Sequence, residues 1–363
     1  MHIVLVILLC ACFGVIDLLN SRGRLGSTKK WQAVIGGLLI FLYGALRAST
    51  VGGDVAGYFD DFRTDMRMSY ADILNASSSY TQSRDPVFHL TLKLLSHVWA
   101  DPQIMLIAIA AVVAVGFTLF VYKSSSNLLL SFLMFICLRI FDFTLSGLRQ
   151  SIAMGIVWLS IAFIDGKKPM RFILTVLIAS LFHSSALVFL IAYPLSKLRR
   201  VRWVLGISAA FLAVNFVTGN ALIHALAQLP GLSRYAGYLK GIENQSGMTT
   251  LLMQVGILIF SFFFKKQMEK DEPRTAFFFN MYIVGLVFTF LGFDFANIFR
   301  IGYYFIIYMV VLLPAAINSQ RDNKAVMLTN YLVAILLIGQ YALLGPGAGT
   351  ANYQFCWQEL GRW

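Results

Sequence analysis

Charged residues are scarce in this sequence: Asp, Glu, Lys and Arg make up 13% of its 363 residues, whereas hydrophobic residues make up 58%. A water-soluble domain carries about 25% charged residues, so the composition excludes that class and indicates a helical membrane protein. Acidic residues are the scarcer sign, with 17 against 29 basic ones. Because the basic residues lie mainly in short runs between apolar stretches, they indicate membrane topology, and we predict no nucleic-acid partner.

Cysteine is scarce as well, which excludes a disulfide framework. The chain has four, Cys10, Cys12, Cys137 and Cys356, and they show no metal-site spacing. The first two lie two residues apart on one apolar stretch and cannot bridge without strain. We therefore predict neither disulfides nor a cofactor.

Polar stretches are few, and the longest is the insert at 49–102. Most of the remaining chain divides into apolar stretches of about 17–22 residues, the length that crosses a hydrocarbon core of about 30 Å. We predict an all-α transmembrane helical bundle, one integral membrane domain over 1–363 with about ten full spans. The spans are expected near 2–20, 31–48, 103–122, 127–144, 148–164, 203–220, 249–264, 276–292, 296–316 and 325–344.

Lys and Arg in short loops predict the orientation, because such loops stay in the cytoplasm. The loop at 21–30 carries two arginines and two lysines, which places the N-terminus outside. The insert at 49–102 then lies outside too, and its many aspartates agree with that side.

The segment 171–197 conflicts with a simple alternation of spans. Basic runs at 167–171 and 197–202 both indicate cytoplasmic loops, and one crossing cannot join two loops on the same side. We interpret the segment as a re-entrant helical hairpin that turns at Phe182-His183-Ser184-Ser185, with arms of about 11 residues, or roughly 16 Å of helix. The alternative is one ordinary crossing that violates the charge rule.

A few charged residues collect at the outer face under this topology, and they are functional candidates because burying charge in a membrane is costly. Asp142 is the central residue of a Phe-Asp-Phe motif, and Arg149 follows it by a few residues. Asp294 is the central residue of a second such motif, which Arg300 follows. Each Asp either caps the following helix and neutralises its Arg, or the two guanidiniums grip a diphosphate. The other candidates at this face are Arg47, Asp54 and Tyr58.

Small residues around Arg149 predict close helix packing. Gly147, Ser151 and Gly155 lie on one stripe of the helix expected at 148–164, and this spacing lets helices approach closely. Arg149 lies about 200° around the helix from Gly147. It therefore faces away from the seam and can point into a cavity.

His183 is the one histidine in the apolar middle of a span-like segment. In one interpretation His183 has a purely structural role and forms hydrogen bonds with Ser184 and Ser185. A neutral imidazole also accepts a proton near physiological pH. The predicted turn would lift it into the same outer cavity as the arginines.

Four blocks of sequence form a set. They are Leu46-Arg47 with Gly53-Asp54 and Tyr58-Phe59, then Leu148-Arg149-Gln150-Ser151-Ile152-Ala153-Met154, then Ala179-Ser180-Leu181-Phe182-His183-Ser184-Ser185-Ala186, and Phe299-Arg300 with Tyr303-Tyr304-Phe305. Over most of its length the chain thereby resembles the EpsG family of polysaccharide polymerases, functional relatives of Wzy-type O-antigen polymerases. Members often have a Glu-Pro pair after the first outer loop, whereas this chain has Arg84-Asp85-Pro86, which keeps a carboxylate.

The resemblance implies transfer of a growing glycan from one polyprenyl (undecaprenyl) diphosphate carrier to the sugar end of another lipid-linked repeat. It implies a glycosyltransferase-C-like fold and an active site on the periplasmic side of the bacterial inner membrane. The implied partners are the lipid-linked oligosaccharide donor and acceptor, membrane lipids and a chain-length regulator.

Such a transfer needs charge stabilisation on the leaving group and a base near the acceptor hydroxyl. We assign Arg149 and Arg300 to the diphosphate, with Arg47 as a weaker third, and the base is either Asp54 or His183. No catalytic metal is predicted, because arginines can neutralise the leaving group. Supporting roles are expected for Tyr58, Asp85, Asp142, Gln150, Asp294 and Tyr303.

Two other classes of function remain open from the sequence. A transporter or flippase of the same lipid-linked repeat would also need arginines that face a phosphate, but the Phe-Asp-Phe echo is too short to indicate an inverted repeat. A membrane acyltransferase would use His183 as its base, although the sequence shows no acyl-donor site.

Overall fold

The computed structural model describes residues 2–21, 27–75, 86–228, 247–295, 298–347 and 349–359. Within these ranges every regular element is an α-helix or a 3₁₀-helix, and the one pairing of extended backbone is the antiparallel bridge between Arg47 and Phe355. The all-α prediction is confirmed for this part of the chain. Helices are expected here, because lipid offers no hydrogen-bond partners and a helix satisfies its backbone internally.

The helices form two compact units, of which unit 1 comprises Met1–Leu187 with Asn330–Trp363 and unit 2 comprises Val188–Thr329. The prediction of one membrane domain over 1–363 stays a prediction. The helices of unit 1 are α1 (His2–Ser21), α2 (Thr28–Ala45), α3 (Val55–Arg67), α4 (Tyr70–Asn75), α5 (Pro86–Ser96), α6 (Gln103–Ser124), α7 (Leu128–Cys137), α8 (Ile140–Ser146), α9 (Leu148–Asp165), α10 (Pro169–Phe182), most of α18 (Asn323–Leu344) and the short η4 (Cys356–Gln358).

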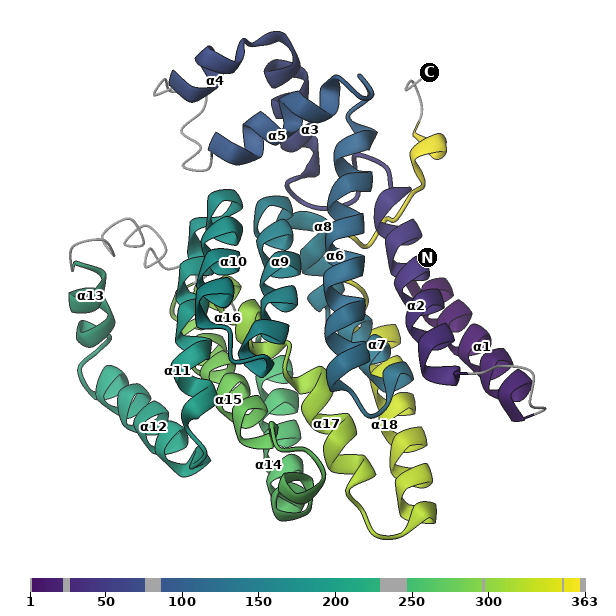
Figure 1. The fold of residues 1–363 in the computed structure, drawn as a ribbon, viewed down its shortest axis with the longest axis vertical. Coiled ribbons are helices and arrows are strands. Elements are labelled where there is room, and N and C mark those ends of the chain that lie inside the picture. The colour runs from purple at the N-terminus through teal and green to yellow at the C-terminus, as the bar shows by residue number, and fades with distance from the viewer. Residues whose placement is uncertain are drawn as a thin grey trace. The chain divides into compact units, whose positions relative to one another are not determined.

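Helices α2, α6, α9 and α10 pack side by side in that order (Figure 1). Glycines make the seams narrow. A Cβ on Gly116 of α6 would overlap the carbonyl oxygen of Gly155 on α9, and a Cβ on Gly155 would lie 2.8 Å from the carbonyl oxygen of Val112. The prediction that Gly155 allows close helix packing is therefore confirmed.

Unit 2 is built around α15, which packs against α11, α12, α14, α16 and α17. Buried polar groups connect the layers: the Asn280 side chain donates to the carbonyls of Leu195 and Leu198, and the Tyr282 hydroxyl donates to the carbonyl of Gln254. The elements of this unit are the second half of η1 (Ser184–Ile191), α11 (Ala192–Lys197), α12 (Val201–Val217), α13 (Ala221–Ala227), α14 (Met248–Asp271), α15 (Thr275–Leu291), α16 (Ile298–Ile306) and α17 (Met309–Asn318).

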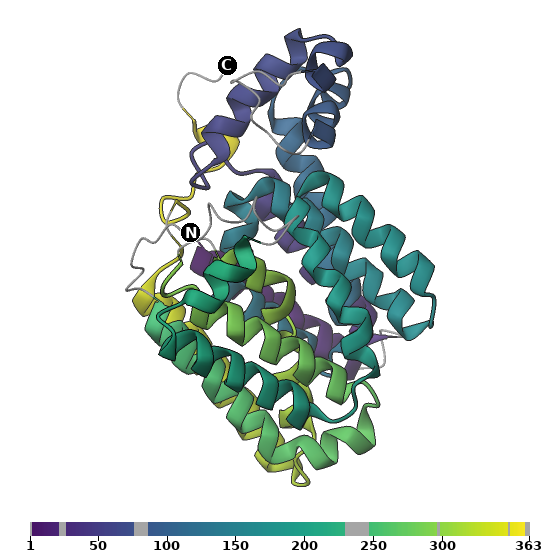
Figure 2. The ribbon, with the colours of Figure 1, turned by 90° about the vertical axis from the view of Figure 1, so that its left-hand side faces the viewer.

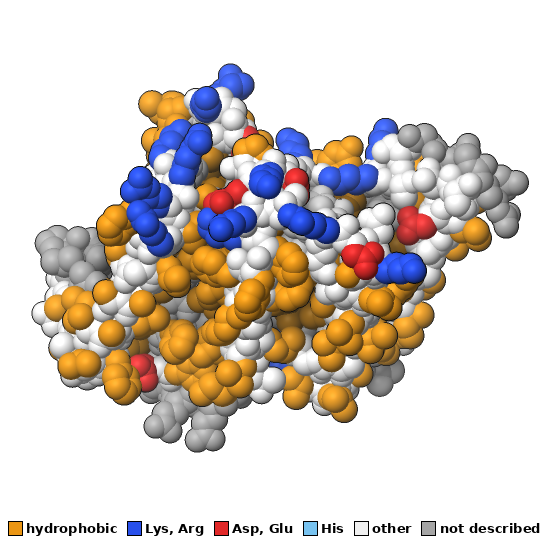
Figure 3. All heavy atoms as spheres, turned by 90° about the horizontal axis from the view of Figure 1, so that it is seen from below, with side chains coloured by type: hydrophobic (Ala, Val, Ile, Leu, Met, Phe, Trp, Pro, Cys, Tyr) orange, Lys and Arg blue, Asp and Glu red, His pale blue; other side chains and the backbone are white. Residues whose placement is uncertain are grey.

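Six helical segments of the described chain are long and apolar enough to cross a membrane, which indicates a multi-pass membrane protein. Large apolar side chains point outward from several helices, as lipid contact requires; Phe216 is 85% exposed and Leu343 87%. Figure 3 shows Lys and Arg side chains set apart from wide areas of hydrophobic surface. The six segments are Ile3–Ser21, Gln103–Ser124, Leu148–Asp165, Met248–Asp271, Ile298–Asn318 and Asn323–Leu344.

The expected count of about ten spans is not confirmed, and it stays a prediction together with the glycosyltransferase-C-like arrangement. Helices α12 and α15 have 17 residues each, and α2 begins with polar residues that lower its hydropathy. The span expected at 127–144 is broken between α7 and α8 by a bend of 56°. Arg139 causes the break with a left-handed backbone, at φ 62°.

The insert at 49–102 is a helical cap of α3, α4 and α5, with residues 76–85 outside the described part. Figures 1 and 2 show these helices beyond the ends of α6 and α9 within unit 1. Helix α3 packs on α5, and α5 also contacts α10. The outer location of this cap stays a prediction.

The segment 171–197 breaks where the hairpin was predicted to turn. Helix α10 ends at Phe182, His183 has an extended backbone with φ −155°, and the 3₁₀-helix η1 begins at Ser184. Whether the segment is re-entrant or a full crossing stays a prediction.

Candidate active site

Arg149 lies in the first turn of α9, two residues after Gly147, the C-cap of α8. Its guanidinium carbon is 6.0 Å from the centre of the Tyr58 ring on α3, which is within the range of a cation–π interaction. Both side chains are half-buried. Two residues selected from the sequence, 91 positions apart, therefore meet.

The face of α3 that bears Tyr58 is acidic. Asp54, Tyr58, Asp61 and Asp65 follow one another at intervals of four, three and four residues, the spacing that puts side chains on one helix face. Burial raises the pKa of the Tyr58 hydroxyl, Arg149 opposes that shift, and the charge of Asp54 adds to it. Asp54, the N-cap of α3, is exposed and makes no side-chain capping bond.

Asp65 and His89 form a buried pair that the sequence interpretation missed. The Asp65 Oδ2 lies 2.8 Å from the His89 Nδ1, and the two side chains are 1% and 6% exposed. The pair joins α3 to α5. The signal in the sequence was the acidic spacing on α3, but nothing local in the chain indicated that α5 would return to it.

Asp61 lies on the same face of α3, three residues after Tyr58 and four before Asp65. Burial raises the pKa of its carboxyl, the charges of His89 and Arg149 lower it, and the neighbouring carboxylates of Asp65 and Asp60 raise it again. The side chain is half-buried. Asp61 was also missed, and it belongs to the same electrostatic cluster as Arg149.

His183 lies at the same end of unit 1 as Arg149. Helices α9 and α10 pack on one another and are joined by residues 166–168, so they are antiparallel, and the end of α10 adjoins the beginning of α9. His183 is half-buried. The topology thus brings the two most specific blocks of the sequence, Arg149-Gln150 and Phe182-His183, to one end of a helix pair.

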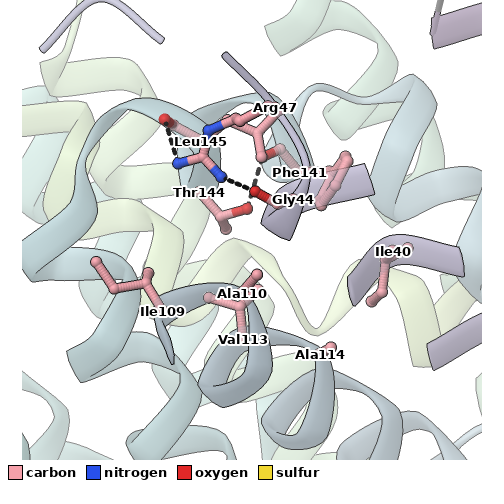
Figure 4. A pocket seen from close by; sticks show the side chains of 10 residues that line it. All are labelled: Ile40, Gly44, Arg47, Ile109, Ala110, Val113, Ala114, Phe141, Thr144 and Leu145. Carbon is pink, nitrogen blue, oxygen red and sulfur yellow. Dashed lines mark hydrogen bonds between the residues drawn. The ribbon is translucent and has the colours of Figure 1, made fainter. Parts of the chain in front are cut away.

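Arg47 is buried, and its guanidinium faces main-chain carbonyls rather than an open site. It donates to the carbonyl of Gly44, to Val51 at 3.3 Å and to Leu145 at 3.1 Å. Figure 4 shows it at the edge of a small apolar cavity of about 10 Å³, room for about one water molecule. Its described contacts make it a structural clamp that fixes the loop between α2 and α3 against α8.

Asp142 and Gln150 are buried within unit 1. Asp142 accepts a hydrogen bond of 2.6 Å from the main-chain N–H of Gly347 and one of 3.4 Å from the Tyr341 hydroxyl. Arg139, three residues earlier, donates to carbonyls at the end of α18. The bend between α7 and α8 therefore holds the C-terminal end of α18.

The remaining predicted residues belong to unit 2 or fall outside the described part of the chain. Arg300 and Tyr303 are half-buried on α16 in unit 2, and Asp294 accepts a hydrogen bond of 3.1 Å from Asn220. Asp85 lies outside the described residues. The joint action of Arg149 and Arg300 on one diphosphate stays a prediction.

The cluster in unit 1 combines the guanidinium of Arg149 with carboxylates of α3 and the imidazole of His89. A guanidinium can neutralise a phosphate, and a half-buried carboxylate can accept a proton. In the described part of the chain, no group of three or more His, Cys, Asp or Glu side chains has an arrangement that could hold a metal ion. The guanidinium and the carboxylates are groups that suit phosphate and acid–base chemistry.

Comparisons with known proteins give one match. A family model described as the EpsG family matches residues 30–355. Neither the curated proteins nor the solved structures contain a significant match to the chain. The family is associated with membrane polysaccharide polymerisation by glycosyl transfer. Because the matched range includes nearly the whole chain and the entire cluster around Arg149, the protein belongs to the EpsG family.

Proposed function

We propose that the protein is a polysaccharide polymerase of the Wzy type, which joins undecaprenyl-diphosphate-linked oligosaccharide repeats on the periplasmic face of the bacterial inner membrane. Family membership supports the class of reaction. The observation that carries the assignment to a site is Arg149, seated on the Tyr58 ring beside the acidic face of α3. O-antigen, capsule and exopolysaccharide repeats are all within this class.

In this mechanism the acceptor hydroxyl attacks the anomeric carbon of the donor sugar directly, with inversion. Arg149 neutralises the charge that develops on the departing diphosphate. Arg300 is proposed as a second ligand, and Asp54 or His183 as the proton acceptor. Arg47 remains a weaker third candidate for the diphosphate, and its described guanidinium contacts are with main-chain carbonyls. The arginines are proposed to take the place of a catalytic metal.

The test is polymer formation in reconstituted vesicles from a purified lipid-linked repeat. Arg149→Ala should lower the rate by about 10²- to 10³-fold, the usual loss when one charge-stabilising donor is removed, while Arg300→Ala and His183→Ala test their own assignments. The control is Arg63→Ala, since Arg63 is an exposed arginine paired with Asp60 on α3. A wild-type protein that translocates the labelled lipid but makes no ladder of products would instead be a transporter.

A further inference from the structure

Helix α3 carries three carboxylates, Asp60, Asp61 and Asp65, and they differ in solvent exposure and in their partners. Asp60 is exposed and pairs with Arg63 at 3.1 Å. Asp65 is buried against His89. Asp61 is half-buried, and among the described residues none donates a hydrogen bond to its side chain. Of these three carboxylates, only that of Asp61 is both partly shielded from water and still accessible to a substrate.

A general base must be ionised and yet basic enough to take a proton. Asp61 lies one helical turn after Tyr58, whose ring centre is 6.0 Å from the Arg149 guanidinium carbon, and one turn before Asp65, which pairs with His89 at 2.8 Å. Burial and the carboxylates of Asp65 and Asp60 raise the pKa of the Asp61 carboxyl, whereas the charges of His89 on α5 and Arg149 on α9 lower it.

We propose that Asp61 is the general base that takes the proton from the acceptor hydroxyl, and that His89, oriented by Asp65, is a positioning residue for it. The proposal rests on the proposed polymerase function. As the hydroxyl oxygen forms its bond to the anomeric carbon, its proton passes to the Asp61 carboxylate. The bond from that carbon to the diphosphate oxygen breaks, and its electron pair leaves with the diphosphate beside Arg149.

The two residues selected from the sequence fit this role less well. Asp54 is exposed at the start of α3, where water competes for any hydroxyl it binds. His183 lies at the same end of the α9–α10 pair as Arg149, whereas Asp61 lies one helical turn after Tyr58, whose ring contacts the Arg149 guanidinium. The base is therefore placed on the helix that contacts the guanidinium.

The experiment compares Asp61→Asn, Asp61→Glu and the control Asp60→Asn in vesicles with the purified lipid-linked repeat. Asp61→Asn should lower kcat by about 10²- to 10⁴-fold with KM little changed, which is the usual contribution of a general base. Asp61→Glu keeps a carboxylate and should recover activity to within about tenfold of wild type. Asp60→Asn should stay within about twofold of wild type, because that side chain faces water.

The acidic limb of the kcat/KM profile tests the positioning role. Asp61 must be ionised, so activity falls as the pH drops through its pKa. His89→Gln removes a charge that lowers this pKa and should move the limb to higher pH, whereas Asp60→Asn should move it slightly lower. A purely structural role of His89 would change the amount of folded protein but not the position of this limb.

The outcomes separate the two proposals. If wild type polymerises and Asp61→Asn polymerises equally well, the base is not Asp61, while the polymerase function stands. If wild type makes no polymer, the polymerase function fails and the inference fails with it. If Asp61→Asn does not fold, Asp61→Glu and the limb shifts with His89→Gln and Asp60→Asn still decide, and unchanged limbs in both variants would overturn the proposal.

Discussion

Gly116→Ala should destabilise unit 1, although alanine is the better helix former. The new Cβ would overlap the carbonyl oxygen of Gly155 and lie 2.8 Å from its Cα. These are backbone atoms of α9, so they cannot rotate away. Helices α6 and α9 would have to separate by roughly 1 Å, a gap that forfeits up to half of the dispersion attraction along the seam.

The magnitude follows from two opposing effects. Overpacking costs about 1–3 kcal/mol, and the Gly-to-Ala change in helix propensity returns up to about 1 kcal/mol. We expect a net loss of about 1–2 kcal/mol in the free energy of unfolding, or roughly 3–6 °C in the thermal midpoint of the detergent-solubilised protein. Because α9 carries Arg149, polymerase activity should fall as well.

The control is Gly14→Ala on α1, where a Cβ meets no atom within 4 Å. This variant retains only the propensity effect and should be unchanged or slightly more stable. Equal midpoints for the two variants would refute the reasoning, because they would show that the α6–α9 seam accepts a methyl group.

Three further predictions concern single side chains. Tyr58→Leu removes the ring under Arg149 and should lower kcat/KM by about 3- to 30-fold, whereas Tyr58→Phe keeps it and should stay near wild type; steady-state kinetics of both would decide. Arg139→Ala removes the hydrogen-bond donors at the C-terminal end of α18 and should lower the free energy of unfolding by about 1–2 kcal/mol. Limited proteolysis should then show faster cleavage at that end, and an unchanged cleavage rate would mean that other contacts hold it. Burial raises the pKa of Glu272, but the hydrogen bonds from Arg274 outweigh it and the pKa is lowered. Glu272→Gln should therefore cost about 0.2–1 kcal/mol at neutral pH, a difference that disappears as the pH falls through the lowered pKa, and thermal midpoints at both pH values test it.

Part of the candidate site was predictable from local sequence. The spacing of Gly147, Ser151 and Gly155 indicated a tight seam, and the structure places Gly155 against α6. Arg149 faces away from that seam and meets Tyr58. These inferences succeeded because helical periodicity determines which side chains share a face.

Other parts were not predictable. The expected straight span at 127–144 is broken at Arg139, because this arginine adopts a left-handed backbone while its side chain caps α18, more than 200 residues later. A single sequence contains no local signal for such a partner. The same holds for Asp65 and His89, which lie 24 residues apart on separate helices.

Composition and periodicity by themselves determined that this chain is an all-helical membrane protein, because lipid leaves the backbone no other way to satisfy its polar groups. They also identified the polar residues whose burial in a membrane is energetically unfavourable, and these became the candidates for a functional role. The tertiary structure decided how those residues are used. It turned Arg47 toward main-chain carbonyls and Asp142 toward Gly347, and it gathered Arg149, Tyr58 and Asp61 into one cluster. Each choice depends on segments that are distant in sequence and adjacent in the fold, where a buried charge is stabilised only by the partner that packing brings to it.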